Sequence, residues 1–428
     1  MRKTGFSLLS LVVGVCALPS VAFAQDAAPA APAPAPGAPT PVAAPPANAA
    51  DSAPASAAPA PADAAPAPPA DAPPAAPPAV TYPNMAITGY VEGAYHRGLN
   101  KGTTYTTPQF THVYDTANGF QLHAMHLSVH SAVNEHVSAT VDIDAGSDAA
   151  VNNGSGYTPA RTLFDIQEAY AQLTESGFTL TAGKFATYEG IELIEGPTNP
   201  TLTRGFLYGF AEPITHVGAK LHYTTPMYDL GVGVVNGWDT NGPGGTTATG
   251  GIPAGLWTSD NNDQKTFIWR AAVTPDPMFW AAFSGTYGVE KTDSDVDPRL
   301  SLDLTGAVVP SPNVTLNFQG NYGSEKNSSK SPAGGTASWL GLGLQPVVHV
   351  DAVSLGGRIE WFKDTNGARL GIDDTSYVNL TVTPGYTFYN AFTIRGEFRY
   401  DHATNAVLGP KVDSKGQTSA GIGAHYVF

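Results

Sequence analysis

Apolar and polar residues alternate along the last strand-like stretch of the chain, residues 418–428. Counting back from Phe428, every second residue is apolar, whereas the positions between them carry mostly small or polar side chains. Because successive side chains of a β-strand point to opposite faces, this stretch predicts a strand with one apolar and one polar face. The same alternation occurs over residues 137–144, 353–361 and 392–400, with charged residues on one face only.

Turn residues divide residues 84–428 into hairpins. Seven short turns rich in Pro, Asn, Asp and Gly are predicted at 133–136, 174–177, 224–226, 274–277, 310–313, 345–351 and 384–390. Eight longer connections alternate with them at 98–119, 147–162, 189–213, 239–263, 291–298, 324–335, 364–375 and 402–417. Together these connections join sixteen strands and place both ends of the strand array on the short-turn side. The strand over 120–131 changes phase near Ala124, which predicts a β-bulge or a shifted register.

Two-faced strands fit two kinds of protein, a soluble sheet with a core and a membrane barrel with a wet lumen. Only 13% of the residues are charged and 46 are glycine, whereas charged residues approach about a quarter of a soluble domain. Short turns on one side, long loops on the other and an even strand number are typical of outer-membrane barrels. We therefore predict an all-β fold, a closed antiparallel transmembrane barrel of about 16 strands, in contact with outer-membrane lipid. Aromatic residues near strand ends, among them Tyr228, Trp238 and Tyr287, are expected in its interfacial girdles.

The N-terminal part of the chain has a different composition. Residues 1–24 have the basic start, apolar centre and small-residue cleavage site of a signal peptide, which contains the single cysteine, Cys16. Residues 25–83 are almost entirely Ala and Pro, so we predict a disordered periplasmic linker, either a spacer or tether that approaches the cell wall or a passive tail. Residues 84–428 then form the barrel, in the outer membrane and with a periplasmic N-terminus. No later segment has the roughly 18 continuous apolar residues of a membrane-spanning helix.

The region 168–218 carries the sharpest motifs of the chain. These are Glu168-Ala169-Tyr170, Gly183-Lys184-Phe185 and the run from Arg204 to Gly218, which includes Ala211-Glu212-Pro213. With them the chain resembles the β-barrel porin-2 family, also called OmpL-like. The resemblance implies an outer-membrane porin, a passive diffusion channel for small hydrophilic solutes or ions, and analogy with general porins makes a homotrimer plausible.

The connection 189–213 combines glutamates with an apolar second half, so we expect it to fold into the lumen, as the third loop of general porins does. Across a sixteen-stranded barrel it would face arginines of the predicted strands near the C-terminus. One hypothesis is a constriction with loop carboxylates opposite wall guanidinium groups, whose transverse field orients solutes. The alternative is that Arg358 and Arg395 only pair with neighbouring glutamates and support the barrel. The candidate pore-lining and constriction residues are Glu189, Glu192, Glu195, Arg204, Glu212, Arg358, Arg395, Arg399, Asp142 and Asp144.

Charge and motifs bear on the remaining functional classes. The excess of 36 acidic over 21 basic residues argues against nucleic acid as a partner and favours a mild preference for cations. On a regular strand His126 and His130 share a face that His123 does not, so we expect no metal site, and no cofactor. No catalytic motif stands out, so we predict no enzymatic activity. The rival interpretations are a non-conducting surface adhesin or structural barrel and an outer-membrane hydrolase.

Overall fold

The computed structural model describes residues 84–100, 119–152, 163–238, 262–291, 295–329, 333–370, 372–409 and 413–428. The predicted signal peptide, residues 1–24, and the predicted linker, residues 25–83, lie outside the described residues, as do parts of several predicted loops. No helix among the described residues is long and apolar enough to cross a membrane.

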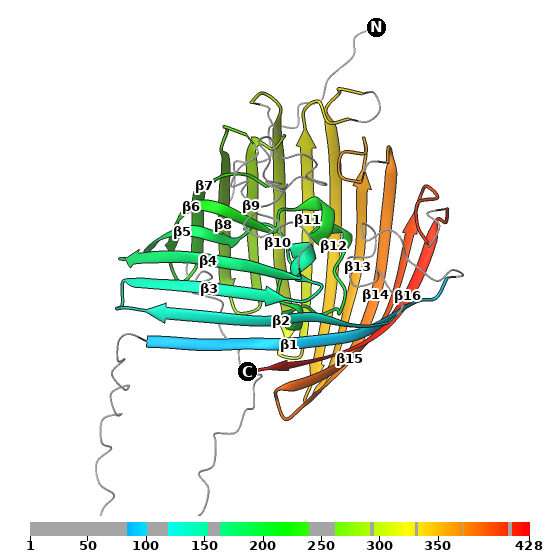
Figure 1. Ribbon diagram of the computed structural model, residues 1–428, viewed down its shortest axis with the longest axis horizontal. Helices are drawn as coiled ribbons and strands as arrows, with labels where there is room; N and C mark the ends of the chain where they lie inside the picture. Colours follow the sequence, from blue (N-terminus) through cyan, green and yellow to red (C-terminus); the bar gives the residue numbers. More distant parts are fainter. Residues whose placement is uncertain are drawn as a thin grey trace, which may run out of the picture.

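Sixteen antiparallel strands form one closed barrel in which every strand pairs with its neighbour in the sequence and β16 pairs with β1 (Figure 1). This confirms the predicted fold class and strand number. The strands are β1 (Asn84–Gly98), β2 (Gly119–Ala132), β3 (Val137–Ala145), β4 (Phe164–Glu175), β5 (Phe178–Ala186), β6 (Thr215–Thr224), β7 (Tyr228–Val235), β8 (Thr266–Asp276), β9 (Phe279–Val289), β10 (Pro298–Ser311), β11 (Val314–Glu325), β12 (Ala337–Val350), β13 (Val353–Asp364), β14 (Thr375–Phe388), β15 (Phe392–Ala403) and β16 (Gly416–Val427). Short helical turns occur at α2 (Ala149–Asn152), η2 (Gly196–Thr198) and η3 (Leu207–Ala211).

The C-terminal residue completes the closure of the barrel. The backbone amide of Gly89 donates to the carbonyl oxygen of Phe428 at 3.0 Å, and the amide of Phe428 donates to the carbonyl oxygen of Gly89 at 2.9 Å. Beyond this pair the register runs from Tyr90 opposite Val427 to Gly98 opposite Ser419. Closure removes the unpaired strand edges that a bilayer cannot hydrate.

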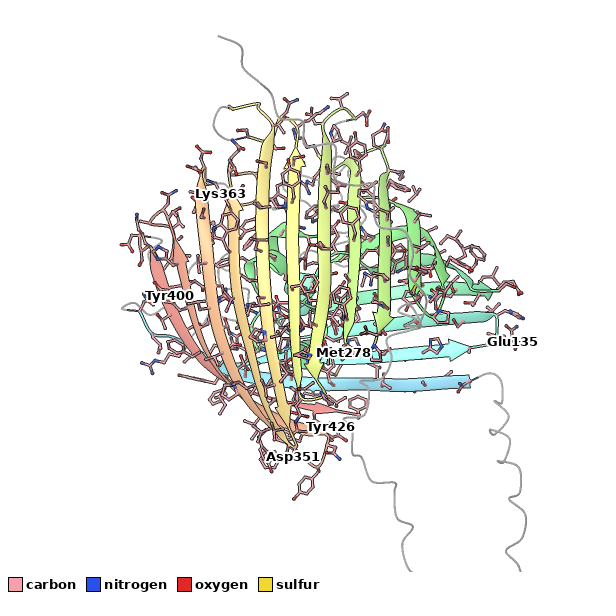
Figure 2. The ribbon with its side chains drawn as sticks, turned by 180° about the vertical axis from the view of Figure 1, so that it is seen from behind. Glu135, Met278, Asp351, Lys363, Tyr400 and Tyr426 are labelled. Carbon is pink, nitrogen blue, oxygen red and sulfur yellow. The ribbon has the colours of Figure 1, made fainter. Side chains whose placement is uncertain are left out.

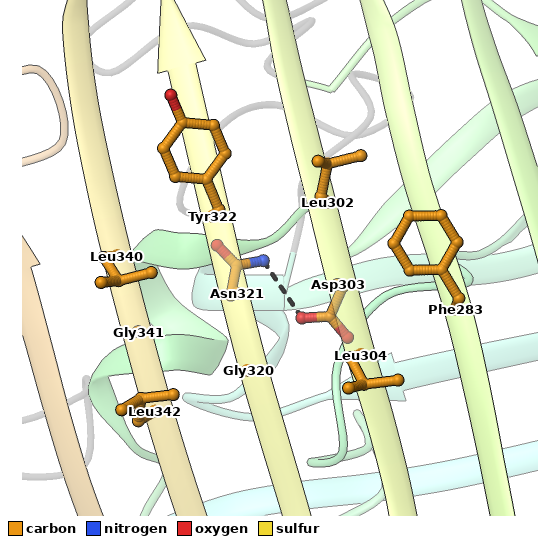
Figure 3. Close-up of a pocket in the computed structure, with 10 residues that line it drawn as sticks. All are labelled: Phe283, Leu302, Asp303, Leu304, Gly320, Asn321, Tyr322, Leu340, Gly341 and Leu342. Carbon is orange, nitrogen blue, oxygen red and sulfur yellow. Dashed lines mark hydrogen bonds between the residues drawn. The ribbon is translucent and has the colours of Figure 1, made fainter. Parts of the chain in front are cut away.

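Each strand presents an apolar face outward and a polar face inward. On β13, Leu355 and Ile359 are 46% and 50% exposed, whereas Arg358 between them is fully buried inside the barrel. Figure 3 shows the same division on β10, where Leu302 and Leu304 flank a shallow apolar groove on the outer surface and Asp303 accepts a hydrogen bond from Asn321 at 3.1 Å. The charged side chains lie on the inner face. The outer face can therefore contact lipid without the cost of removing charges from water.

The short turns lie at one end of the strands, as Figure 2 shows for Asp351 with Lys363 near the other end of β13. Two predicted turns were too long, because β12 continues to Val350 and β14 to Phe388. Pro346 and Pro384 thus lie within strands rather than in turns. Gly357 of the next strand makes room for the Pro346 ring, because a Cβ atom there would lie 3.1 Å from it, whereas a Cβ atom at Gly396 would make an ordinary contact with Pro384 at 4.0 Å.

Two further sequence predictions have clear outcomes. The phase change near Ala124 is a β-bulge, because the register between β1 and β2 shifts at Glu92 and Gly93 and leaves His123 as the extra residue of β2.

The assignment of Trp238 to an aromatic girdle was wrong. Its side chain is buried within an interior cluster that includes Trp339, whereas Tyr228 and Tyr287 are exposed on the outer face as expected.

Candidate functional site

The connection between β5 and β6, residues 187–214, lies inside the barrel and is called the lumen loop below. Its backbone and side chains contact the inner faces of strands on several sides, including β1, β4, β10, β11, β13 and β15. Its η3 segment, drawn in green, lies near β11 and β12 in Figure 1. The loop therefore crosses the barrel interior instead of projecting from its end.

Arg358, in the middle of β13, joins the wall to the lumen loop. Its guanidinium group donates to the Glu192 carboxylate at 2.7 Å and to the Thr201 hydroxyl at 2.8 Å, and it also donates to the Thr203 carbonyl oxygen. On the wall side it donates to the Asn379 amide oxygen at 2.9 Å. Planar guanidinium groups can satisfy several acceptors at once, so one buried arginine fixes two segments of the loop.

Arg395 and Arg399 on β15 make similar contacts. Arg395 pairs with Glu92 of β1 and donates to the Asn199 carbonyl oxygen at 2.9 Å. Arg399 pairs with Asp401 at 3.0 Å and donates to the carbonyl oxygen of Arg204 at 2.6 Å. Both arginines thus use a wall carboxylate for charge balance and loop carbonyl groups as further acceptors.

Arg204 is part of the loop's own framework. Its guanidinium group donates to the Ile194 carbonyl oxygen at 2.7 Å and lies 5.5 Å from the ring centre of Tyr208. The Gly205 amide donates to Glu192 at 2.6 Å, so Glu192 links Arg358 to the loop backbone at Gly205.

Two wall glutamates accept hydrogen bonds from the loop backbone. Glu397 of β15 accepts from the Leu202 amide at 2.6 Å and from the Thr203 hydroxyl at 2.6 Å. Glu360 of β13 accepts from the Phe206 amide at 2.7 Å. The sequence placed both side chains inside but did not indicate that they would bind loop amides, since that depends on where the loop backbone comes to rest.

A second set of contacts lies where the loop leaves β5 and returns to β6. The Ser301 hydroxyl of β10 donates to Glu189, and the Gly190 amide donates to Asp303 at 3.2 Å. The Gln319 amide of β11 donates to both Glu212 and Asp303, at 2.6 and 2.8 Å. Three carboxyl groups therefore share a buried region, in which the Gln319 amide bridges Glu212 and Asp303.

Burial, with repulsion from Asp303, raises the pKa of Glu189 from 4.5 to about 8. The pKa of Glu212 is also raised well above its usual value, again by burial and then by Asp303. Both loop carboxyl groups consequently take up protons at far higher pH than exposed glutamates do.

Acidic residues also line β3 and β4 on the other side of the loop. Glu195 accepts a hydrogen bond from the Gln167 amide of β4 at 2.8 Å. Asp144 of β3 lies 2.8 Å from His126 of β2, and Asp142 lies opposite Glu168 in the register. Asp142 and Asp144 are both buried, with inward-facing side chains as the alternation predicted.

The apolar second half of the lumen loop has its own hydrophobic environment. Phe206 and Leu207 belong to a buried cluster with Trp339, Phe362 and Tyr377 from β12, β13 and β14. The Trp339 indole also donates to the Ala211 carbonyl oxygen at 3.3 Å. The expectation that this half of the loop requires burial is therefore met by wall aromatics.

His123 does not point away from the lumen, contrary to the expectation from a regular strand. The bulge in β2 turns its side chain inward beside His96 of β1, a residue that the sequence analysis did not consider. Among the described residues, no group of three or more His, Cys, Asp or Glu side chains could hold a metal ion.

A closed barrel with an apolar outer face, a polar inner face and a long loop folded inward defines a class of membrane-spanning channel proteins. Residues 84–428 match the family described as "Putative beta-barrel porin-2, OmpL-like", and the chain belongs to this family. The protein is an outer-membrane porin, as the sequence resemblance predicted.

Solved outer-membrane channels share the fold at low sequence identity. The channel DcaP of Acinetobacter baumannii is 11% identical with a TM-score of 0.55, covering 81% of this chain and 97% of that chain. An anion-selective porin from Comamonas acidovorans is 12% identical with a TM-score of 0.53, covering 81% and 99%. OprB of Pseudomonas putida is 13% identical with a TM-score of 0.51, covering 80% and 94%. No curated protein matches the chain.

Proposed function

We propose that this porin is a passive diffusion channel for small hydrophilic solutes or ions whose constriction is formed by the lumen loop. The observation that carries the proposal is the attachment of the loop to the middle of β13 through Glu192 and Arg358, 2.7 Å apart. A loop held at this depth narrows the lumen that sixteen strands would otherwise leave open.

The ten candidate residues divide by their position around the loop. Arg358, Arg395 and Arg399 lie on one wall, each in contact with a carboxylate. The other candidates, apart from Arg204, are acidic and lie on the loop or on β3. We infer a transverse field from this asymmetry and, from the overall acidic charge, a mild preference for cations.

Assembly and orientation are also proposed. One solved structure with this fold, OmpT of Vibrio cholerae, is described as a trimer form and is 12% identical with a TM-score of 0.50. β7 has only 8 residues and β3 and β5 have 9, against 14 in β10. A partner subunit would cover this low wall, so we infer a homotrimer. The short turns then face the periplasm together with the N-terminus, and residues 25–83 could extend toward the cell wall.

Conductance of the purified protein in planar lipid bilayers, with liposome swelling in sugars of increasing size, tests the function. A diffusion channel gives open-channel currents and swelling that declines with sugar size. A filled barrel that serves as an adhesin or structural protein gives neither.

We infer no enzymatic activity, and hydrolysis of lipid or peptide substrates by the pure protein would contradict that inference.

The Glu192→Gln and Arg395→Ala variants test the constriction separately from the channel function. Each removes one charge beside the loop, so the ratio of cation to anion permeability should change. Currents with unchanged ion selectivity in both variants would retain the channel and reject the charged constriction. Glu135, exposed in the turn between β2 and β3, provides the control variant Glu135→Gln.

A further inference from the structure

His96 of β1 and His123 of β2 face each other inside the barrel wall. Their Nε2 atoms are 3.1 Å apart, and both side chains are almost fully buried, with 2% and 1% exposure. The two imidazole rings are nearly parallel, with 10° between their planes and 5.0 Å between their centres. The two Nε2 atoms therefore face each other across a short gap.

The strand geometry brings the pair together. His123 is the extra residue of the bulge in β2, which directs its side chain toward β1 rather than toward lipid. On the other side of β1, Gly421 of β16 leaves space for the His96 ring, since a Cβ atom there would lie 2.8 Å from His96 Nδ1. Bulges commonly re-aim a side chain in this way.

Two arrangements satisfy such a short distance between Nε2 atoms. One is a hydrogen bond between two neutral imidazoles. The other is a metal ion bound to both nitrogens, because metal–imidazole bonds of about 2.0–2.1 Å span this separation at an angle of about 100° at the metal. That angle lies between those of tetrahedral and square-planar sites, whereas a linear two-coordinate ion would require a wider separation.

The chemistry of the donors selects the ion. Imidazole nitrogen suits Zn²⁺, Ni²⁺ and Cu²⁺, whereas Ca²⁺ and Mg²⁺ prefer oxygen ligands. The charges that act on the pair include the carboxylates of Glu92 and Glu397 and the guanidinium groups of Arg399, Arg395 and Arg204, so both signs are present. The choice of metal ion would therefore depend on the two nitrogen donors rather than on an excess of negative charge around the site.

We propose that His96 and His123 form a two-imidazole binding site for one divalent transition-metal ion, Zn²⁺, Ni²⁺ or Cu²⁺. The site lies near the end of β1 from which the connection 99–118 leaves. It goes beyond the diffusion function and does not depend on it.

Cu²⁺ titration of the purified full-length protein in detergent, followed by electron paramagnetic resonance, tests the site. The expected spectrum shows hyperfine coupling to two imidazole nitrogens at one ion per chain. His96→Ala and His123→Ala should each weaken this binding at least tenfold, and excess Mg²⁺ should not compete. His130→Ala is the matched control, because His130 lies on the same strand as His123 with its ring bonded to the Thr140 hydroxyl at 3.1 Å.

The variants His96→Asn and His123→Asn keep a polar side chain in the buried site, and heat-dependent gel mobility shows whether each barrel folds. Folded variants that bind Cu²⁺ with the affinity and spectrum of the unmodified protein would overturn the proposal. The same holds if the unmodified protein shows no two-nitrogen species at millimolar Cu²⁺, in which case the pair is a hydrogen bond between imidazoles.

Discussion

Arg358 and Glu192 are 166 positions apart in the chain, yet their side chains form a fully buried ion pair at 2.7 Å. One residue lies in the middle of β13 and the other in the lumen loop that follows β5. Breaking a buried pair by removing one partner is costly, about 3–5 kcal/mol, because the other charge stays buried without compensation. This contact therefore contributes strongly to holding the loop in place.

We expect Arg358→Ala to release the loop and destabilise the barrel. The substitution leaves Glu192 without its charged partner and with only the Gly205 amide as a donor, so the unfolding temperature should fall and single-channel conductance should become larger or more variable. Heat-dependent gel mobility and bilayer recordings measure the two effects. Arg97→Ala, at an exposed position of β1, is the control. Unchanged conductance and stability in Arg358→Ala would show that the pair does not hold the loop.

The attachment of the loop near β10 should depend on pH through Glu189. Its pKa is raised from 4.5 to about 8 in the folded protein, so the neutral acid is the favoured form in the docked loop. The stabilisation from this group is fully present below about pH 4.5 and is lost as pH rises through about 8. Protease protection of the loop should therefore decline over this window. Glu189→Gln should reduce the decline, with Glu212 accounting for the remainder, and a variant that keeps the decline unchanged would contradict the assignment.

Gly356 of β13 lets the loop backbone approach the wall. A Cβ atom there would overlap the Pro200 carbonyl oxygen, so Gly356→Ala should displace this part of the loop and alter single-channel conductance. Gly320→Ala is the matched control, because its added Cβ atom on the outer face would lie 3.7 Å from Leu342, an ordinary contact. Equal conductance in both variants and the unmodified protein would mean that the close approach has no role in the pore.

The alternation of apolar and polar residues was sufficient to predict the barrel. Side chains that alternate with a period of two indicate strands, and once the turns are located few other folds fit the pattern. Residues 137–144 and 353–361 have the predicted faces, and the bulge beside Ala124 was visible as a phase change. The ends of β12 and β14 were misjudged, because proline usually marks a turn or the end of a strand, whereas Pro346 and Pro384 lie within strands.

The interior was less predictable. That the loop would fold inward followed from its apolar half, but the partners of Glu360 and Glu397 include backbone amides, which no side-chain pattern records. The pairing of His96 with His123 depends on the direction that the bulge gives to one side chain. Such contacts join residues far apart in sequence, so they require coordinates.

The most direct test of the central claim compares single-channel conductance of the unmodified porin with that of a variant in which residues 191–211 are replaced by a short Gly-Ser linker. The account predicts a larger conductance and weaker ion selectivity in the variant. Equal conductance and selectivity in two correctly folded barrels would contradict a constriction formed by the lumen loop.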